Sequence, residues 1–151
     1  YCQTFSVVLT AEVDMTIKAY SADKLEMLET ISLEQAREKQ GEKGGRSSSK
    51  VSVMSCMPQN SQLLLGGERG CELWQVLKSA RRRQALVGRL EFHLNIEFVR
   101  QVCDREVSHI NISASEQRVI LWGPKWLGVY DMNLKELARC ASPHGAELTR
   151  C

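Results

Sequence analysis

The side chains that could bind a metal ion or act as nucleophiles are scattered through this sequence. Only Cys140 and His144 have a spacing that suits two ligands of one zinc ion, and no second pair accompanies them. The common nucleotide-binding, metalloprotease and hydrolase motifs do not occur, and no carboxylate pair is placed for acid–base catalysis. We therefore expect no metal, no cofactor and no enzyme activity. The histidines are His93, His109 and His144, and the cysteines are Cys2, Cys56, Cys71, Cys103, Cys140 and Cys151.

The cysteines fit reduced packing positions better than disulfides. Their spacing is irregular, and Cys56 and Cys71 fall at apolar positions of strand-like segments. A disulfide framework is the alternative, because the number of cysteines is even. We expect an intracellular protein that is cytoplasmic, with a ciliary or nuclear location as further options. No apolar run reaches the roughly 18 residues of a membrane helix, so no membrane contact is expected.

Three segments could recognise or carry phosphate. The basic segment Lys78–Arg83, with Lys78, Arg81, Arg82 and Arg83, could contact nucleic acid or act as a nuclear-import signal. A solvated loop is favoured instead, because no aromatic residues are interleaved to stack bases. The glycine-rich stretch 66–70 lacks a lysine and a following helix, which favours a hairpin turn. The stretch from Arg46 to Ser49 could be phosphorylated by a kinase that prefers basic residues, or could be a plain flexible loop.

A repeated pattern of short strands carries these residues. Residues 51–76 and 107–132 share one apolar pattern without a gap, at an offset of 107 − 51 = 56. A shorter copy upstream, at an offset of 74 − 20 = 54, places Leu9 on Leu63 and Tyr20 on Trp74. Alternating apolar and polar residues predict strands. The expected strands are 5–11, 16–20, 25–31, 51–57, 62–65, 71–77, 90–98, 107–112, 118–122, 126–131 and 134–140.

The composition and the repeats predict the organisation of the chain. With 43% hydrophobic and 25% charged residues and a formal net charge of +2, it resembles a soluble globular protein. It begins with Tyr1, and we expect a fragment of a longer chain. The fold class is all-β, with three four-stranded antiparallel blades as part of a larger propeller. We expect a first repeat at 1–33, incomplete at its start, and then a flexible polar insertion at 34–50, with a helix at 33–39 as the alternative. A second repeat at 51–100 contains a basic loop at 78–89. A third repeat and a C-terminal tail make up 101–151.

Over most of residues 5–140 the chain resembles the WD-repeat (WD40) propellers. That family ends the third strand of each blade with Trp-Asp, and here only Trp74 keeps the Trp and only Asp131 the Asp. The Gly-His pair that begins a repeat is absent, and the repeats are longer than the usual 40–45 residues. Asp14, with Glu68 as a substitute, matches the acidic residue before that strand, whereas the third copy has Pro124 there. Thr10 is the strand hydroxyl that could partner Asp14. The resemblance thus implies a structural role inside the blades for Thr10, Asp14, Tyr20, Trp74, Tyr130 and Asp131.

By the same resemblance, the function is that of a protein-interaction scaffold that uses the loops of one face. The first alternative is a nucleic-acid-associated or nuclear-targeted module using the basic segment, and the second is a set of ring-closing blades in a cytoskeletal or ciliary assembly. The expected partners are other proteins and the remaining blades of the same chain, rather than nucleic acid. Trp122 is expected in the core, and Trp126 either in the core or as an exposed anchor. The partner-binding candidates are Asp14, Glu68, Arg69, Arg105, Lys125 and Trp126.

Overall fold

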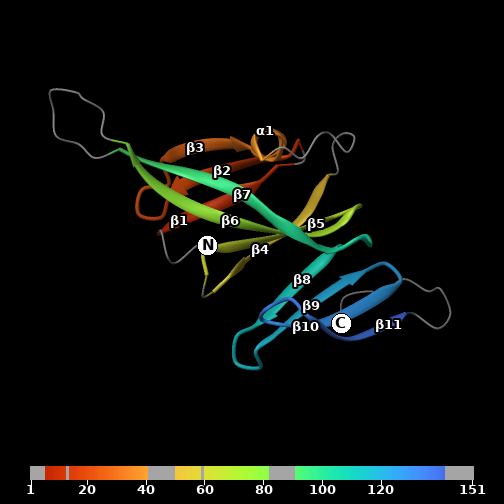
Figure 1. Cartoon of the computed structure of the whole chain (residues 1–151). Helices are drawn as coiled ribbons and strands as arrows, with labels where there is room; N and C mark the ends of the chain where they lie inside the picture. The colour runs from red at the N-terminus through yellow and green to blue at the C-terminus, as the bar shows by residue number, and fades with distance from the viewer. Residues whose placement is uncertain (1–5, 13, 41–49, 59, 82–90, 142–151) are drawn as a thin grey trace, which may run out of the picture.

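The computed structural model describes residues 6–12, 14–40, 50–58, 60–81 and 91–141, with residues 79–81 and 91–92 described by their backbone alone. This part of the chain forms three antiparallel β-sheets and one short helix (Figure 1). The all-β fold class predicted from the sequence is therefore confirmed. Among the described residues, no helix has the length and apolar character needed to cross a membrane.

The sheets follow one another along the chain, and each is a meander of neighbouring strands. The first has three strands and the other two have four each. The first sheet contains β1 (Val7–Ala11), β2 (Thr16–Ser21) and β3 (Met27–Ser32), and helix α1 (Leu33–Lys39) follows it. The second contains β4 (Val51–Met57), β5 (Gln62–Gly67), β6 (Gly70–Arg81) and β7 (Glu91–Cys103). The third contains β8 (His109–Ser113), β9 (Arg118–Gly123), β10 (Trp126–Asp131) and β11 (Glu136–Ala141).

The second sheet is buried on both faces. Three consecutive residues of β5, Leu63, Leu64 and Leu65, are each at most 3% exposed. Because neighbouring strand residues point to opposite faces, Leu63 and Leu65 pack towards the first sheet and Leu64 towards the third. The core between the first two sheets includes Val7, Leu9, Ile17, Ala19, Trp74 and Val76. The core between the second and third sheets includes Cys71, Leu73, Val119, Leu121, Trp126 and Tyr130.

The β1–β2 turn is one residue longer than the equivalent turns of the other sheets. Three residues separate its last paired positions, whereas two do so in the β5–β6 and β9–β10 turns. The ungapped alignment of Leu9 with Leu63 was therefore wrong, and Leu9 corresponds to Leu64. A shift of one residue moves a strand side chain to the opposite face. Leu9 accordingly faces the following sheet, as Leu64 does.

Helix α1 corrects the flexible insertion expected over residues 34–50. Residues 34–39 are helical, so the alternative of a helix at 33–39 is the correct one. The Ser32 hydroxyl caps the helix by accepting a hydrogen bond from the backbone N–H of Gln35 at 3.4 Å. Leu33 is fully buried and Ala36 nearly so, both in the core between the first two sheets. These tertiary contacts stabilise a helix that is too short to persist alone. Residues 41–49, with the stretch from Arg46 to Ser49, lie outside the described residues.

The β6–β7 hairpin extends further than expected at both ends. Strand β6 continues to Arg81, so Lys78 lies in a strand and the loop expected over residues 78–89 was wrong at its start. Residues 82–89 are outside the described part of the chain. Strand β7 continues to Cys103, three residues past the expected boundary at residue 100, with shifts in register against β6 along its last part. Figure 1 shows this hairpin reaching out at the end opposite to the β5–β6 turn.

The outer faces of the first and third sheets differ in polarity. On the third sheet, the face turned away from the core carries Ile120, Trp122, Leu127 and Val129, which the register places side by side. Trp122 is half-buried there and stacks on His109 with ring centroids 4.9 Å apart, so its expected place in the core is wrong. The corresponding face of the first sheet carries Val8, Thr10, Lys18, Tyr20 and Thr30.

Candidate functional site

Five chain connections meet at one end of the molecule, which we call the loop face. It comprises the β1–β2, β5–β6 and β9–β10 turns, helix α1 and the β7–β8 connection, on the right in Figure 1. Backbone hydrogen bonds tie these segments together. The N–H of Leu33 donates to the carbonyl of Met15, and that of Val107 donates to the carbonyl of Gly67, both at 2.9 Å. The loop face is therefore a continuous surface built from all three sheets.

Glycine is required where the connections cross the ends of β5 and β9. A Cβ at Gly67 would collide with the carbonyl oxygen of Lys50, and one at Gly123 would collide with that of Glu106. The two glycines are 123 − 67 = 56 positions apart and hold the same place in their sheets. At both points the incoming connection lies directly over the strand end, where only a residue without a side chain leaves room.

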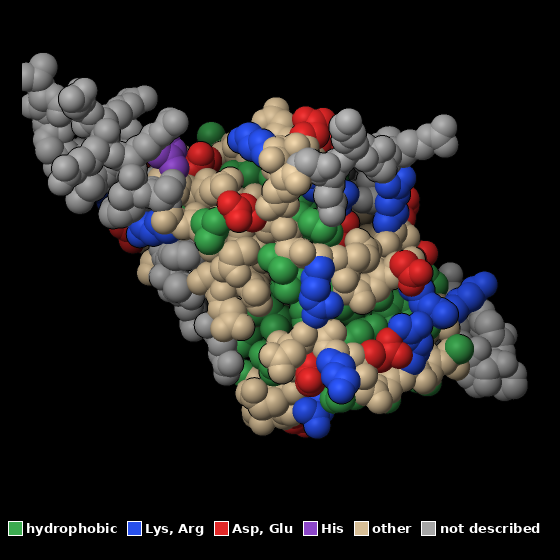
Figure 2. Space-filling model, in the orientation of Figure 1, with side chains coloured by type: hydrophobic (Ala, Val, Ile, Leu, Met, Phe, Trp, Pro, Cys, Tyr) green, Lys and Arg blue, Asp and Glu red, His purple; other side chains and the backbone are tan. Residues whose placement is uncertain are grey.

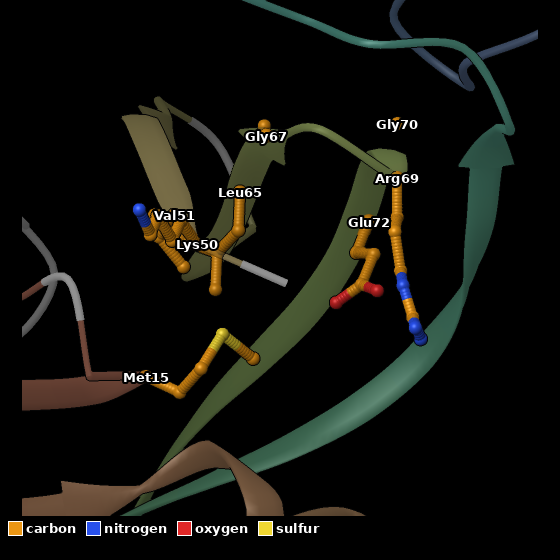
Figure 3. A pocket seen from close by; sticks show the side chains of 9 residues that line it. Met15, Lys50, Val51, Leu65, Gly67, Arg69, Gly70 and Glu72 are labelled. Carbon is orange, nitrogen blue, oxygen red and sulfur yellow. The ribbon is translucent and has the colours of Figure 1, made fainter. Parts of the chain in front are cut away.

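A hollow opens on the loop face between the first and second sheets (Figure 3). Met15 and Leu65 give it apolar walls, Lys50 and Arg69 contribute positive charge, and Glu72 is the one carboxylate among its described lining residues. Figure 3 shows the carboxylate of Glu72 turned into the hollow, with the Arg69 side chain beside it. Met15 has a φ of 65°, a left-handed conformation that an ordinary side chain adopts at a cost of about 1 kcal/mol. Its side chain is 3% exposed, so packing in the core holds this conformation.

A hydrogen-bonded network lies behind Glu72. The guanidinium of Arg37, from α1, pairs with one oxygen of the Glu72 carboxylate. The indole N–H of Trp74 donates to the other oxygen at 3.0 Å. Arg37 also lies over the rings of Trp74 and Phe98, 5.4 Å from each centroid. Those two rings meet edge to face with their centroids 5.4 Å apart. Arg37 therefore joins the helix to the second sheet through both a carboxylate and two aromatic rings.

The third sheet has a similar set of groups nearer to solvent. The Tyr130 hydroxyl donates to Glu136 at 3.3 Å, and Glu136 pairs with Arg139. Arg139 lies 5.9 Å from the centroid of the Trp126 ring. Burial is the main cause that raises the pKa of Tyr130 to about 12.

Most of the partner-binding candidates lie on the loop face. Asp14, Glu68, Arg69, Arg105 and Lys125 are all exposed in its turns and connections. Figure 2 shows Lys and Arg side chains mixed with Asp and Glu at this end of the molecule, over the side of the third sheet. Trp126 is different. It is 5% exposed, and its indole N–H donates to the carbonyl of Glu106 at 2.8 Å, so its expected place in the core is confirmed and the alternative of an exposed anchor was wrong.

The residues expected to stabilise each sheet internally differ in burial and in hydrogen bonding. Trp74 and Tyr130 are almost completely buried, whereas Tyr20 is half-buried on the outer face of the first sheet. The carboxylate of Asp131 accepts hydrogen bonds from the backbone N–H groups of residues 133 and 135, both at 2.9 Å, which fixes the β10–β11 turn. Asp14 accepts from the N–H of Thr16 at 3.2 Å. The expected contact between Asp14 and Thr10 does not form in the described part of the chain.

The remaining chemical groups form no site within the described residues. Cys71, Cys103 and Cys140 are free thiols, and burial raises the pKa of Cys71 and of Cys103. No group of three or more possible metal ligands occurs among the described residues. His144, Arg82 and Arg83, as well as Cys2 and Cys151, lie outside them, and only the backbone of Arg81 is described. His93 lies 3.5 Å from the carboxylate of Glu29, and the ring of His109 is hydrogen-bonded to Ser108 at 3.0 Å.

Comparison with solved structures identifies the architecture. Over 95% of its length the chain matches the β-propeller domain of Myceliophteria thermophila Cps50 (Swd1), with a TM-score of 0.55 and 12% sequence identity. This chain has the fold of part of a β-propeller. The propeller fold expected from the resemblance is thereby confirmed, and the three sheets are three blades. The chain spans 42% of the length of that domain. No family model and no curated protein matches the sequence.

The sequence did not reveal Arg37 as a member of this hydrogen-bonded network. It lies in a polar stretch, and its carboxylate partner is 35 positions away. The position of Glu72, two residues before the Trp74 of the third blade strand, was the one available signal. A carboxylate at that spacing points to the same side of the strand as a buried indole and can accept its N–H.

Proposed function

We propose that this chain is part of a protein-interaction scaffold whose loop face captures other proteins. The propeller fold, which usually serves binding rather than catalysis, supports this proposal. The observation that carries it is the loop face itself, where exposed charged residues of both signs stand on turns that backbone hydrogen bonds hold in place. A rigid surface of this kind loses little conformational entropy on binding. We place the protein inside the cell, with its other blades as further partners.

Charge reversal on the loop face tests this function. The variant combines Arg69→Glu with Lys125→Glu, and the matched control combines Lys24→Glu with Lys135→Glu in turns at the opposite end of the blades. Proteins captured from a cell extract are compared by quantitative mass spectrometry. We expect the loop-face variant to lose partners that the unmodified chain and the control both retain, without a change in melting temperature. Equal capture by all three proteins would contradict the proposal.

A salt titration of binding separates protein binding from nucleic-acid binding. If the basic segment contacts phosphates, binding to duplex DNA weakens steeply as salt concentration rises, because counterions are released. We expect no such steep dependence for the loop-face partners, since mixed charges form few contacts of one sign. A structural role in closing the ring would instead leave all loop-face variants without effect on captured partners.

A further inference from the structure

The outer face of the third blade is an apolar surface at one end of the row of sheets (Figure 1). The register of its strands arranges apolar side chains in two cross-strand rows, which consist of Ile120, Trp122, Leu127, Val129, Ala138 and Cys140. The four side chains on β9 and β10 are half-buried, those on β11 are exposed, and none belongs to either core of the described residues. Apolar side chains gathered on one sheet face indicate a surface that binds another protein.

The equivalent face of the second blade shows how a following blade is received. There Gly66 leaves room for the third repeat, because a Cβ at Gly66 would lie 2.8 Å from Cγ1 of Val107, closer than real Cβ atoms come. The equivalent position of the third blade, 122 − 66 = 56 residues later, holds Trp122. A following blade set against the third as the third is set against the second would collide with this indole. The outer face of the third blade is therefore shaped for a different neighbour.

A pair of opposite charges stands at one end of the same face. Arg118 and Asp131 are cross-strand neighbours on β9 and β10, where the second blade has the uncharged Gln62 and Gln75. Arg118 is exposed, and its guanidinium donates to the carbonyl of Gln117 at 3.0 Å. A positive and a negative side chain on adjacent strands make a face complementary to a copy of itself, because a twofold axis between the strands exchanges them.

The apolar rows match under the same symmetry. A twofold axis that runs between β9 and β10, parallel to the strands, places β9 of one copy over β10 of the other and keeps each row in line. Trp122 of each copy then faces Leu127 of the other, and Ile120 faces Val129 in the next row. Sheets pack face to face in this way about 10 Å apart, with their strands turned by about 30°.

From this geometry we propose that the chain forms a symmetric dimer through the outer faces of its third blades. Arg118 of each copy faces Asp131 of the other, which adds two ion pairs at the end of the apolar contact. Four strands of five or six residues cover about 350 Å² of flat area in each copy. This is small for a specific interface, so the dimer is reversible, with a dissociation constant on the order of 10–100 μM.

The dimer goes beyond the proposed scaffold function and does not depend on it. Because the axis runs along the strands, the loop faces of both copies lie at the same end of the assembly and stay uncovered. Two loop faces side by side suit a partner that carries two copies of its binding segment.

Sedimentation equilibrium at chain concentrations from about 1 μM to about 1 mM measures the association. A reducing agent is present throughout, because the exposed Cys140 could otherwise link two chains. We expect the average mass to rise from 17.1 kDa to twice that value and no further. A chain that stays monomeric over the whole range leaves the face to another occupant and overturns the inference. Growth into larger assemblies also overturns it, because a twofold contact closes on itself.

Substitutions locate the contact. Ile120→Lys should raise the dissociation constant about tenfold or more, because it places an ammonium group against apolar side chains. The matched control is Val8→Lys on the outer face of the first blade, which should dimerise as the unmodified chain does. Arg118→Glu should weaken the dimer about threefold to tenfold by repelling Asp131 of the other copy, whereas Arg118→Lys should keep most of the affinity. Circular dichroism confirms that each variant is folded.

Two outcomes separate the dimer from the scaffold function. Equal dissociation constants for Ile120→Lys and Val8→Lys would place the contact elsewhere and overturn the inference. The loop-face variant should dimerise normally while it loses its captured partners. If that variant loses its partners and the unmodified chain is monomeric, the scaffold function stands and only the dimer fails.

Discussion

The second and third blades each combine an arginine, a carboxylate and an aromatic residue, and the two sets differ in how far they are buried. Each places a carboxylate between an arginine and an aromatic residue of its third strand. The side chains of Arg37 and Glu72 are 23% and 12% exposed, whereas those of Arg139 and Glu136 are 33% and 38% exposed. The arginine of the second blade comes from the connection that precedes it, and that of the third blade comes from the same strand as its partner. Only the pair of the second blade, which is the less exposed of the two, therefore joins two separate segments of the chain.

This difference determines what each pair contributes. An ion pair near water gains little, because the solvent screens the charges and both side chains lose freedom. A pair shielded from water adds little to the free energy of unfolding when it is complete. Removing one partner lowers that free energy strongly, because one charge is left without a partner. The pair of the second blade therefore positions α1, whereas the pair of the third blade adds little to the stability of the fold.

Removal of the carboxylates should show the largest effect. Glu72→Ala leaves Arg37 against two aromatic rings without a counter-charge, and we expect a loss of about 2–3 kcal/mol in the free energy of unfolding. The matched change Glu136→Ala should cost about 0.5 kcal/mol or less. Urea denaturation followed by tryptophan fluorescence measures both. Equal losses in the two variants would mean that burial does not distinguish the pairs.

The two ion pairs should also differ, by a smaller amount, in how their coupling free energy responds to salt. Double-mutant cycles with glutamine at both positions isolate the coupling within each pair. We expect about 1–2 kcal/mol for Arg37 with Glu72, largely retained at about 1 M salt, because buried charges are poorly screened. For Arg139 with Glu136 we expect about 0.3–0.5 kcal/mol at low salt and almost nothing at high salt. A coupling in the second blade that vanishes in salt would place that pair in solvent.

A third comparison concerns alkaline pH, to which the third blade should respond through Tyr130. Because burial raises the pKa of Tyr130 from its usual 10 to about 12, the folded protein holds the phenol proton more tightly than the unfolded chain. This contribution to stability is complete below about pH 10 and is lost as the pH rises to about 12. Tyr130→Phe removes the phenol, so its free energy of unfolding should fall less over this range. If the free energy of unfolding fell equally with pH in the unmodified chain and in Tyr130→Phe, Tyr130 would have the same pKa in the folded and unfolded states.

The strands were predictable because their pattern is local. The boundaries of β4 and β10 agree with the expected 51–57 and 126–131, because turn residues follow both strands directly. The register of β1 was not predictable in the same way. One extra residue in a turn leaves the composition of a strand unchanged but reverses its faces.

The candidate site was less predictable because its contacts are distant in sequence. The loop-face candidates followed from the resemblance, and all but Trp126 are exposed there. Helix α1 has one apolar side chain after Leu33, too few to indicate an amphipathic helix. It is ordered by Leu33, Ala36 and an ion pair to a residue 35 positions away, and no local pattern encodes such a contact.

The unequal outer faces of the first and third blades give the array a direction. Adding a sheet beside Ile120, Trp122 and Val129 would withdraw apolar surface from water and lower the free energy. Adding one beside the first blade would bury Val8 and Tyr20 as well, but it would also strip water from the hydroxyl of Thr10 and the ammonium group of Lys18. Covering the outer face of the third blade would therefore lower the free energy more than covering the outer face of the first blade.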